Sequence, residues 1–211
     1  MTLIIDGTDA AFVHIPKCGG TWVKRALRAA NIATTQPKTR LRCGAKHAAL
    51  WGVENHIDVA FTLIRSPQDW LASWFKFQLA NGWKQWETDG WHPQRSIECC
   101  KASTFEQFVL NVIDHQPGYV SRMYEHYAPT GACRYLIGAT HRASDGLCEF
   151  LSRVLPQFTD DQREAIKAFP PQNVSKYACT NLSAKASDSL HHIERYAYER
   201  FASVCESDTL L

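Results

Sequence analysis

Short apolar runs alternate along this chain with longer segments that have helical spacing. The segments Ala11–Ile15 and Val59–Ile64 are short, mostly apolar and bounded by Pro16 and Arg65, which is typical of buried strands. Apolar residues in Thr21–Asn31 recur with the helical period, so this segment is predicted to be a helix. The same reading predicts a strand at Cys133–Gly138 and helices at Thr104–His115, Ser144–Leu155, Asp160–Phe169 and Ala186–Cys205. Strands that alternate with helices favour parallel pairing, so we expect a layered α/β fold.

A helix start follows the second predicted strand. Ser66 is placed to cap this helix and Pro67 to occupy its first position. Trp70, Trp74 and Phe77 then follow at i, i+4 and i+7, a spacing typical of a helix face packed in a core. We therefore expect these three aromatic residues to be core residues.

Length and composition fit a single domain over residues 1–211. The chain has 211 residues, of which 45% are hydrophobic and 21% charged, enough for one sizeable core. An irregular, tryptophan-containing stretch at about 78–103 is predicted to be a lid or a substrate-contacting insertion. No apolar run has the length of a membrane-spanning helix, and the first ten residues contain Asp6 and Asp9 where a signal peptide would be basic and then apolar. We therefore expect a cytoplasmic protein with no transmembrane segment.

The eight cysteines point to neither a disulfide framework nor a metal site. They contain no C-x-x-C pair, the local spacing that zinc sites normally need. The overall composition is that of a protein with an ordinary core, so we expect the thiols to be mostly reduced.

Charge is unevenly distributed. The segment from Ala10 to Val53 contains no Asp or Glu but eight basic residues, and because the whole chain carries +2, the remainder carries −6. The eight are Lys17, Lys24, Arg25, Arg28, Lys38, Arg40, Arg42 and Lys46. Clustered cations attract anions, so this segment predicts a phosphate or sulfate ligand near the N-terminal third.

A glycine-containing turn lies inside this basic segment, between a predicted strand and a predicted helix. Such a turn places free backbone N–H groups and the positive end of a helix dipole at one point, where phosphate binds. Gly19 and Gly20 allow close approach of the backbone, while Lys17 and Thr21 add an ammonium and a hydroxyl. A Walker A loop would carry its lysine after the glycines, and here the lysine precedes them.

The segment His14-Ile15-Pro16-Lys17-Cys18-Gly19-Gly20-Thr21 resembles the 5′-phosphosulfate loop of sulfotransferases that use 3′-phosphoadenosine 5′-phosphosulfate (PAPS). The carbohydrate branch of that family typically reads H-I-P-K-T-G-G-T, with Cys18 here in place of threonine. The resemblance implies that residues Lys17, Cys18, Gly19, Gly20 and Thr21 contact the nucleotide. Trp22 matches the tryptophan that stacks on adenine in the cytosolic branch, and it is equally compatible with a core position.

The segment from Arg65 to Ser73 resembles the second signature of the same family. It contains an Arg-x-Pro after a strand, with a serine eight residues after the arginine. The resemblance implies that Arg65 and Ser73 bind the 3′-phosphate, since a guanidinium can hold phosphate through two parallel hydrogen bonds. Asp69 is expected to orient the arginine or cap the turn.

Together the two signatures imply a three-layer α/β fold of the P-loop NTPase-like sulfotransferase type, with a mostly parallel central sheet flanked by helices. The implied reaction moves a sulfuryl group from PAPS to a hydroxyl of a carbohydrate or small-molecule acceptor, with 3′-phosphoadenosine 5′-phosphate (PAP) as product. It requires neither a metal nor nucleic acid. Lys17 would stabilise the leaving phosphate. His47 is the preferred base, with His56, His14 and Glu54 as alternatives.

Two further residues receive weaker roles. The segment Asn173-Val174-Ser175-Lys176-Tyr177 resembles a region that many carbohydrate sulfotransferases carry before their last helices, which makes Lys176 a cofactor-binding candidate and also a plausible solvated lysine. Cys18, beside Lys17 and several N–H groups, is hypothesised to have a lowered pKa and a reactive thiol.

Two other functions stay open. One is a phosphotransferase of the same layered fold that uses ATP. Against it, the lysine that a Walker A loop carries directly after its last glycine is missing after Gly20, and no Mg²⁺-binding carboxylate is evident. The other is a binding module for 3′-phosphoadenosine nucleotides that performs no chemistry. The sequence does not identify the acceptor or the oligomeric state.

Overall fold

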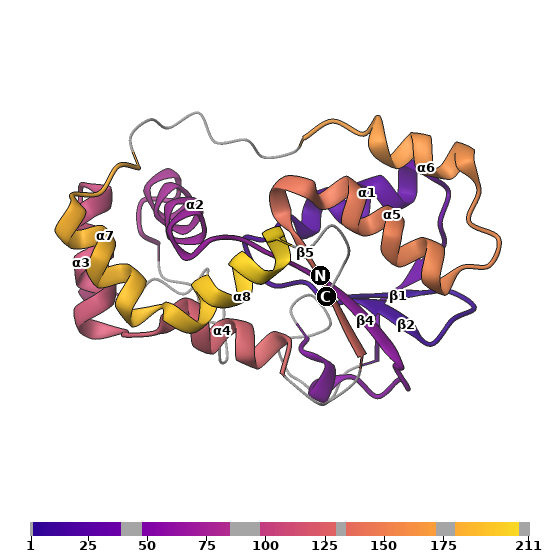
Figure 1. Ribbon diagram of the computed structural model, residues 1–211, viewed down its shortest axis with the longest axis horizontal. Coiled ribbons are helices and arrows are strands. Elements are labelled where there is room, and N and C mark those ends of the chain that lie inside the picture. Colours follow the sequence, from indigo (N-terminus) through magenta and orange to yellow (C-terminus); the bar gives the residue numbers. More distant parts are fainter. Residues whose placement is uncertain (1, 39–47, 85–97, 130–133, 172–179, 207–211) are drawn as a thin grey trace.

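The computed structural model describes residues 2–38, 48–84, 98–129, 134–171 and 180–206. In these segments a mixed five-stranded sheet runs in the order β3-β1-β2-β4-β5 (Figure 1). The strands are β1 (Leu3–Ile5), β2 (Ala10–Phe12), β3 (Thr34–Thr35), β4 (Val59–Ile64) and β5 (Arg134–Ala139). The three neighbours β2, β4 and β5 are parallel, whereas β1 is antiparallel to both β2 and β3.

The prediction of a mostly parallel sheet is therefore correct for β2, β4 and β5 and wrong for the β1 edge. A short turn joins β1 to β2, and Gly7 in that turn has φ +76°, a conformation that glycine adopts without strain. Four residues between strands are enough for a hairpin but too few for the crossover that parallel pairing needs. Neither β1 nor β3 was predicted from the sequence.

Helices cover both faces of the sheet (Figure 1). They are α1 (Gly20–Ala29), α2 (Pro67–Ala80), α3 (Phe105–His115), α4 (Tyr119–Tyr127), α5 (Ala143–Val154), α6 (Asp160–Lys167), α7 (Ala184–Ile193) and α8 (Arg195–Glu206). On one face, Phe61 stacks on Phe150 of α5 with 5.1 Å between ring centroids. On the other, the Tyr135 hydroxyl donates to the Tyr127 carbonyl of α4 at 3.0 Å. Because Phe61 pairs with Leu136, Tyr135 faces the opposite side, and the layers are helix, sheet and helix.

The start of α2 is confirmed. The Ser66 hydroxyl accepts from the Asp69 amide, and Pro67 occupies the first turn. Trp70 and Trp74 are fully buried in the core, as predicted, while Phe77 is only half-buried. The Trp70 indole donates to the Pro16 carbonyl at 2.8 Å, so α2 is tied directly to the loop that follows β2.

The C-terminal helix prediction is wrong in one respect. The expected single helix Ala186–Cys205 consists of two helices, α7 and α8, which are separated at Glu194. Glu194 leaves the helical backbone with φ −103° and ψ 24°, and its buried carboxylate accepts hydrogen bonds from Val120 and Ser121 of α4. The break therefore places this carboxylate at the start of α4, a helix that the sequence pattern did not predict.

The predicted insertion at 78–103 is packed at both of its described ends. Trp83 is 8% exposed, and its ring packs against Phe75 and Phe108, so it is a core residue. Cys100 at the other end is fully buried. Trp86 and Trp91 lie outside the described residues.

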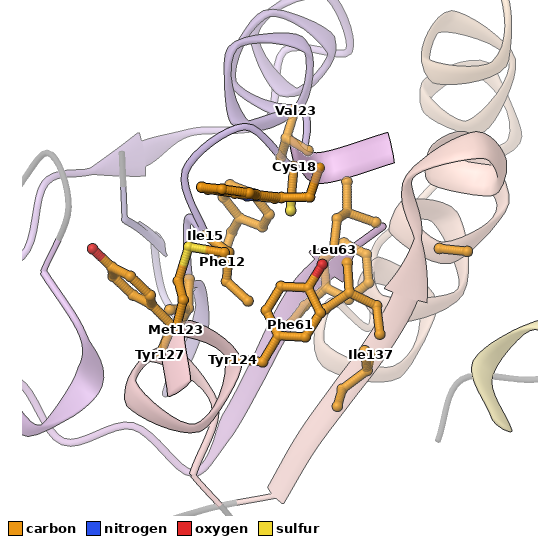
Figure 2. Packing of buried hydrophobic residues seen from close by; sticks show 14 of the residues in the cluster. Phe12, Ile15, Cys18, Val23, Phe61, Leu63, Met123, Tyr124, Tyr127 and Ile137 are labelled. Carbon is orange, nitrogen blue, oxygen red and sulfur yellow. The ribbon is translucent and has the colours of Figure 1, made fainter. Parts of the chain in front are cut away.

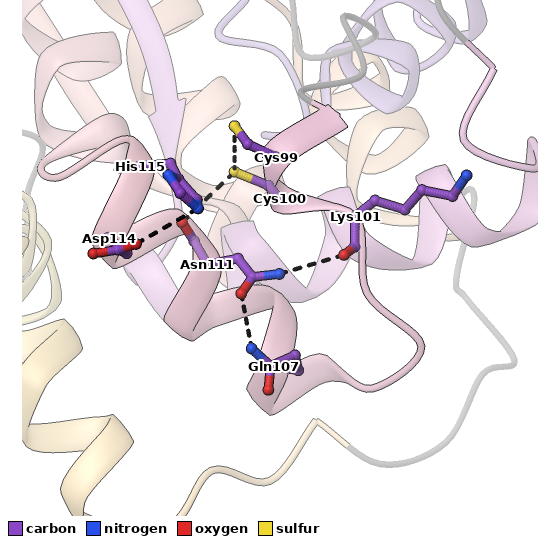
Figure 3. A network of polar contacts seen from close by, with 7 residues as sticks. All are labelled: Cys99, Cys100, Lys101, Gln107, Asn111, Asp114 and His115. Carbon is purple, nitrogen blue, oxygen red and sulfur yellow. Dashed lines mark hydrogen bonds and ion pairs between the residues drawn. The ribbon is translucent and has the colours of Figure 1, made fainter.

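The described cysteines are free thiols, namely Cys18, Cys99, Cys100, Cys148 and Cys205. The adjacent Cys99 and Cys100 have their sulfur atoms 4.0 Å apart, and the Cys100 thiol donates to the Asn111 carbonyl of α3 (Figure 3). In the described segments, no three His, Cys, Asp or Glu side chains are grouped as a metal site would require. None of the helices described is long and apolar enough to cross a membrane.

Candidate anion-binding site

The carboxyl ends of the three parallel strands meet at one edge of the sheet. The glycine loop follows β2, Arg65 follows β4, and Thr140 follows β5. The Thr140 hydroxyl donates to the Ile64 carbonyl at 2.9 Å, which ties the last two strand ends together. In open α/β sheets this edge is where ligands bind, because the loops there leave a crevice between the strand ends and the helices.

Both glycines of the loop are required by its geometry. Gly19 has φ +88° and is the N-cap of α1, so the first turn of this helix has no N-cap side chain bonded to its N–H groups. A Cβ on Gly20 would overlap the imidazole of His14. The His14 ring stacks on Phe12.

A cavity of about 610 Å³ lies at this edge, a size typical of small-molecule sites. The two segments singled out from the sequence both contribute to it, with Gly19 and Trp22 from the first, and Arg65 and Ser73 from the second. The other lining residues are Asp69, Ala72, Lys76, Thr140, His141, Ala143, Ser144, Lys167, Phe169, Pro171, Thr180 and Phe201. Lys17, Cys18, Gly20 and Thr21 are not among them.

The cavity is electropositive. Among the described residues, three permanent cations line it, Arg65, Lys76 and Lys167, against one carboxylate, that of Asp69. That carboxylate accepts from the hydroxyl of Ser66, the N-cap residue of α2, at 2.7 Å. Within the described residues, none of the three cations forms an ion pair.

Arg65 has an unmet hydrogen-bonding requirement. Its Nε atom is buried and has no hydrogen-bond partner in the part of the chain that the structure describes. A buried donor of this kind costs free energy unless a partner satisfies it. An anion in the cavity that Arg65 lines would provide that partner.

Lys17 lies beside the cavity and close to Arg65. Its backbone has φ +66°, and its ammonium lies 4.2 Å from the centroid of the Phe77 ring. Burial, and then the positive charge of Arg65, lower the pKa of Lys17 from 10.5 to about 8. Two cations held together in this way favour an anion between them.

The hypothesis of a reactive Cys18 is wrong. Its side chain is 1% exposed and lies in the hydrophobic core (Figure 2). Burial raises the pKa of the Cys18 thiol to about 12, which outweighs the opposite effects of Arg65 and Lys17. The loop therefore directs this side chain inward, and any contact of Cys18 with a ligand would involve its backbone.

Trp22 forms an aromatic wall of the cavity together with Phe169. The two rings meet edge to face at 6.4 Å, and the Trp22 indole donates to the Phe169 carbonyl at 3.4 Å. Trp22 is only partly buried. This position, between core and cavity, can present an aromatic surface to a ligand.

The preferred base, His47, lies outside the described residues. The next residue, Ala48, is buried, and its carbonyl accepts from the Thr2 hydroxyl at 2.7 Å. The Thr2 oxygen also accepts from the His14 amide at 3.5 Å, which places Ala48 near the end of β2 that leads into the loop.

The alternative base His56 lies elsewhere. Its side chain is 78% exposed and pairs with Asp58 at 2.9 Å, just before β4 begins. The loops that form the cavity follow the carboxyl ends of the parallel strands, whereas His56 precedes the amino end of β4. His56 is therefore separated from the cavity by the length of β4. Glu54 is exposed in the same segment.

Lys176 also lies outside the described residues. Pro171 and Thr180, which precede and follow that segment, both line the cavity. The chain on either side of Lys176 therefore reaches the site.

Sequence reasoning missed several lining residues. Lys76 could have been predicted as a site residue, because Asp69, Ser73 and Lys76 are spaced at i, i+4 and i+7 and so share one helix face. Thr140, Lys167 and Phe169 carry no local signal, and only the tertiary fold brings them to the glycine loop.

Comparison with protein-family models, with curated proteins and with solved structures finds no match. The class of protein is therefore described from the fold and the site alone. The chain is an α/β protein with an electropositive, partly aromatic cavity at the carboxyl edge of its parallel strands.

Proposed function

We propose that this protein is a sulfotransferase that uses PAPS as its donor. The observation that carries the proposal is the convergence of both signature segments on one cavity, where Arg65 has a buried Nε without a partner among the described residues. A doubly charged phosphate is the kind of ligand that satisfies a guanidinium through parallel hydrogen bonds. The resemblance of the second segment assigns Arg65 to a 3′-phosphate, which ATP lacks, and this assignment is the reason for proposing a 3′-phosphorylated nucleotide.

The lining residues, together with Lys17 beside the cavity, supply a partner for each part of such a nucleotide. Arg65 and Ser73 would hold the 3′-phosphate, with Lys76 one helical turn beyond Ser73. Trp22 and Phe169 would hold the adenine ring, because aromatic walls favour flat rings. The uncapped first turn of α1 and Lys17 would hold the 5′-phosphate.

The donor supplies an activated sulfuryl group on its 5′-phosphate. An acceptor hydroxyl forms a bond to sulfur as the bond from sulfur to the phosphate oxygen breaks, and the acceptor proton passes to a base. His47 is the proposed base, since a neutral imidazole accepts a proton near pH 7. Lys17, whose pKa of about 8 leaves it mostly protonated at pH 7, stabilises the charge that develops on the leaving phosphate.

A calorimetric titration with PAP tests the donor site. Separate titrations with ADP, and with ATP plus Mg²⁺, show whether another nucleotide binds instead. We expect PAP alone to bind the wild type, and Arg65→Ala to weaken that binding by about a hundredfold, as the loss of a buried charge-assisted contact does. Arg195→Ala is the matched control, because the Arg195 side chain is 76% exposed and pairs with Glu199 on its own helix. Preference for ATP with Mg²⁺, or no response to any nucleotide, would overturn the proposal.

A second measurement separates an enzyme from a binding module. PAP release from PAPS is followed with a panel of saccharides and phenols as acceptors. His47→Ala should abolish acceptor-dependent release while leaving the PAP dissociation constant unchanged. A wild type that binds PAP but releases none from PAPS with any acceptor would indicate a binding module.

A further inference from the structure

Tyr124 of α4 holds the backbone of Arg65 with a single hydroxyl. The hydroxyl donates to the Arg65 carbonyl at 2.7 Å and accepts from the Arg65 amide at 3.1 Å. Both backbone groups of the residue that follows β4 are thus satisfied by one side chain from another layer. Tyr124 is fully buried, so water does not compete for these bonds.

The same hydroxyl also lies against the glycine loop. Tyr124 and Cys18 lie close enough for each to influence the pKa of the other, and Figure 2 shows the phenol pointing from α4 toward the loop that carries Cys18. Burial raises the pKa of Tyr124 well above its ordinary value, so the hydroxyl keeps its proton and remains a donor. One buried tyrosine therefore contacts both segments that form the site.

The guanidinium of Arg65 needs this support. Its Nε has no partner in the described part of the chain, so the position of the side chain depends on where the backbone is held. A functional group that is misplaced by about 1 Å loses much of its effect. We propose that Tyr124 is a positioning residue, which holds Arg65 so that its guanidinium is ready for the phosphate before the ligand arrives. This inference rests on the proposed function for the identity of that phosphate.

The test removes one oxygen atom. Tyr124→Phe keeps the ring and deletes both hydrogen bonds to Arg65. Tyr135→Phe is the matched control, because the Tyr135 hydroxyl also donates to a backbone carbonyl, that of Tyr127, away from the cavity. Titration with PAP should show affinity reduced about tenfold or more for Tyr124→Phe and changed less than about twofold for Tyr135→Phe.

A double mutant distinguishes positioning from general loosening of the fold. If Tyr124 acts through Arg65, Tyr124→Phe will weaken PAP binding in the wild type but not further in Arg65→Ala. Equal losses in the two backgrounds would show that Tyr124 acts on the site by another route and would overturn the proposal.

An NMR measurement does not depend on any nucleotide. The Nε–H of Arg65, assigned by its loss in Arg65→Lys, should give one slowly exchanging signal in the ligand-free wild type and in Tyr135→Phe, and a broadened or fast-exchanging signal in Tyr124→Phe. A fast-exchanging Arg65 Nε–H in the wild type, or no change in Tyr124→Phe, would overturn the positioning role. Absence of PAP binding together with the expected NMR result would overturn the sulfotransferase proposal and leave the positioning role standing.

Discussion

Lys17 is the residue at which pH should act on this site. Its pKa is lowered from 10.5 to about 8, first by burial and then by Arg65. Between these two values the unfolded chain binds more protons at this position than the folded one, so its contribution to stability rises with pH. An anion, in contrast, binds better to the protonated form. Lys17 therefore predicts opposite pH trends for ligand-free stability and for nucleotide affinity.

We expect PAP affinity to fall above pH 8, by up to about tenfold per pH unit, because one proton is taken up on binding. Calorimetric titrations between pH 7 and 10 measure this trend. Lys17→Arg is the informative variant, since a guanidinium stays charged over that range and should flatten the profile. A profile for Lys17→Arg as steep as that of the wild type would assign the pH dependence to another group.

Single site residues can be predicted from the sequence where they belong to a short motif. Gly19, Trp22, Arg65 and Ser73 belong to two short segments, and the structure places all four on one cavity. Cys18 belongs to the first of these segments, yet its side chain is buried in a core that also contains Tyr124, more than a hundred residues away. Side-chain direction inside a loop is set by tertiary neighbours, and no local pattern encodes it.

Among the elements, α4 depends on a carboxylate from a distant part of the chain. Its N-cap is Gly118, which has no side chain to cap the first turn. Glu194 supplies the cap, with its oxygens accepting from the amides of Val120 at 2.9 Å and Ser121 at 2.7 Å, and from the Ser121 hydroxyl at 2.6 Å. Glu194 is 1% exposed, so these bonds form where water is excluded.

We predict that Glu194→Gln lowers the free energy of unfolding by about 1 to 3 kcal/mol, because the amide nitrogen would face a donor of α4. Glu199→Gln, on the exposed face of α8, should change it by less than about 0.5 kcal/mol. Urea denaturation of the two variants measures the difference. Equal stabilities would show that the cap contributes little to α4.

Helix α4 and the break between α7 and α8, both missed from the sequence, share one physical reason. Strand β4 and helix α2 have a strong apolar period and a recognisable cap, and their predicted starts are confirmed. Helix α4 starts at a glycine, and the break between α7 and α8 lies at a glutamate that serves another helix. The start of α4 and the break between α7 and α8 both depend on the contact of Glu194 with α4. Neither local sequence pattern contains a sign of this contact.

On the scale of the whole molecule, the cavity joins segments from both ends of the chain. Gly19 lies near the amino terminus, while Phe169 and Phe201 belong to the last quarter of the sequence. A ligand that fills the cavity must therefore hold together segments that are far apart in the chain. A ligand bound only by the folded state, at about 100 times its Kd, adds about 2.7 kcal/mol to stability.

Hydrogen exchange with and without PAP tests this coupling over short labelling times, when local opening dominates. We expect slower exchange in the first turns of α1 and α5 and around Phe169, since all three border the cavity. Helix α3 is the internal reference, because none of its residues lines the cavity and its exchange should not change. Protection confined to the glycine loop would mean that the nucleotide contacts only the first segment and leaves the rest of the cavity for the acceptor.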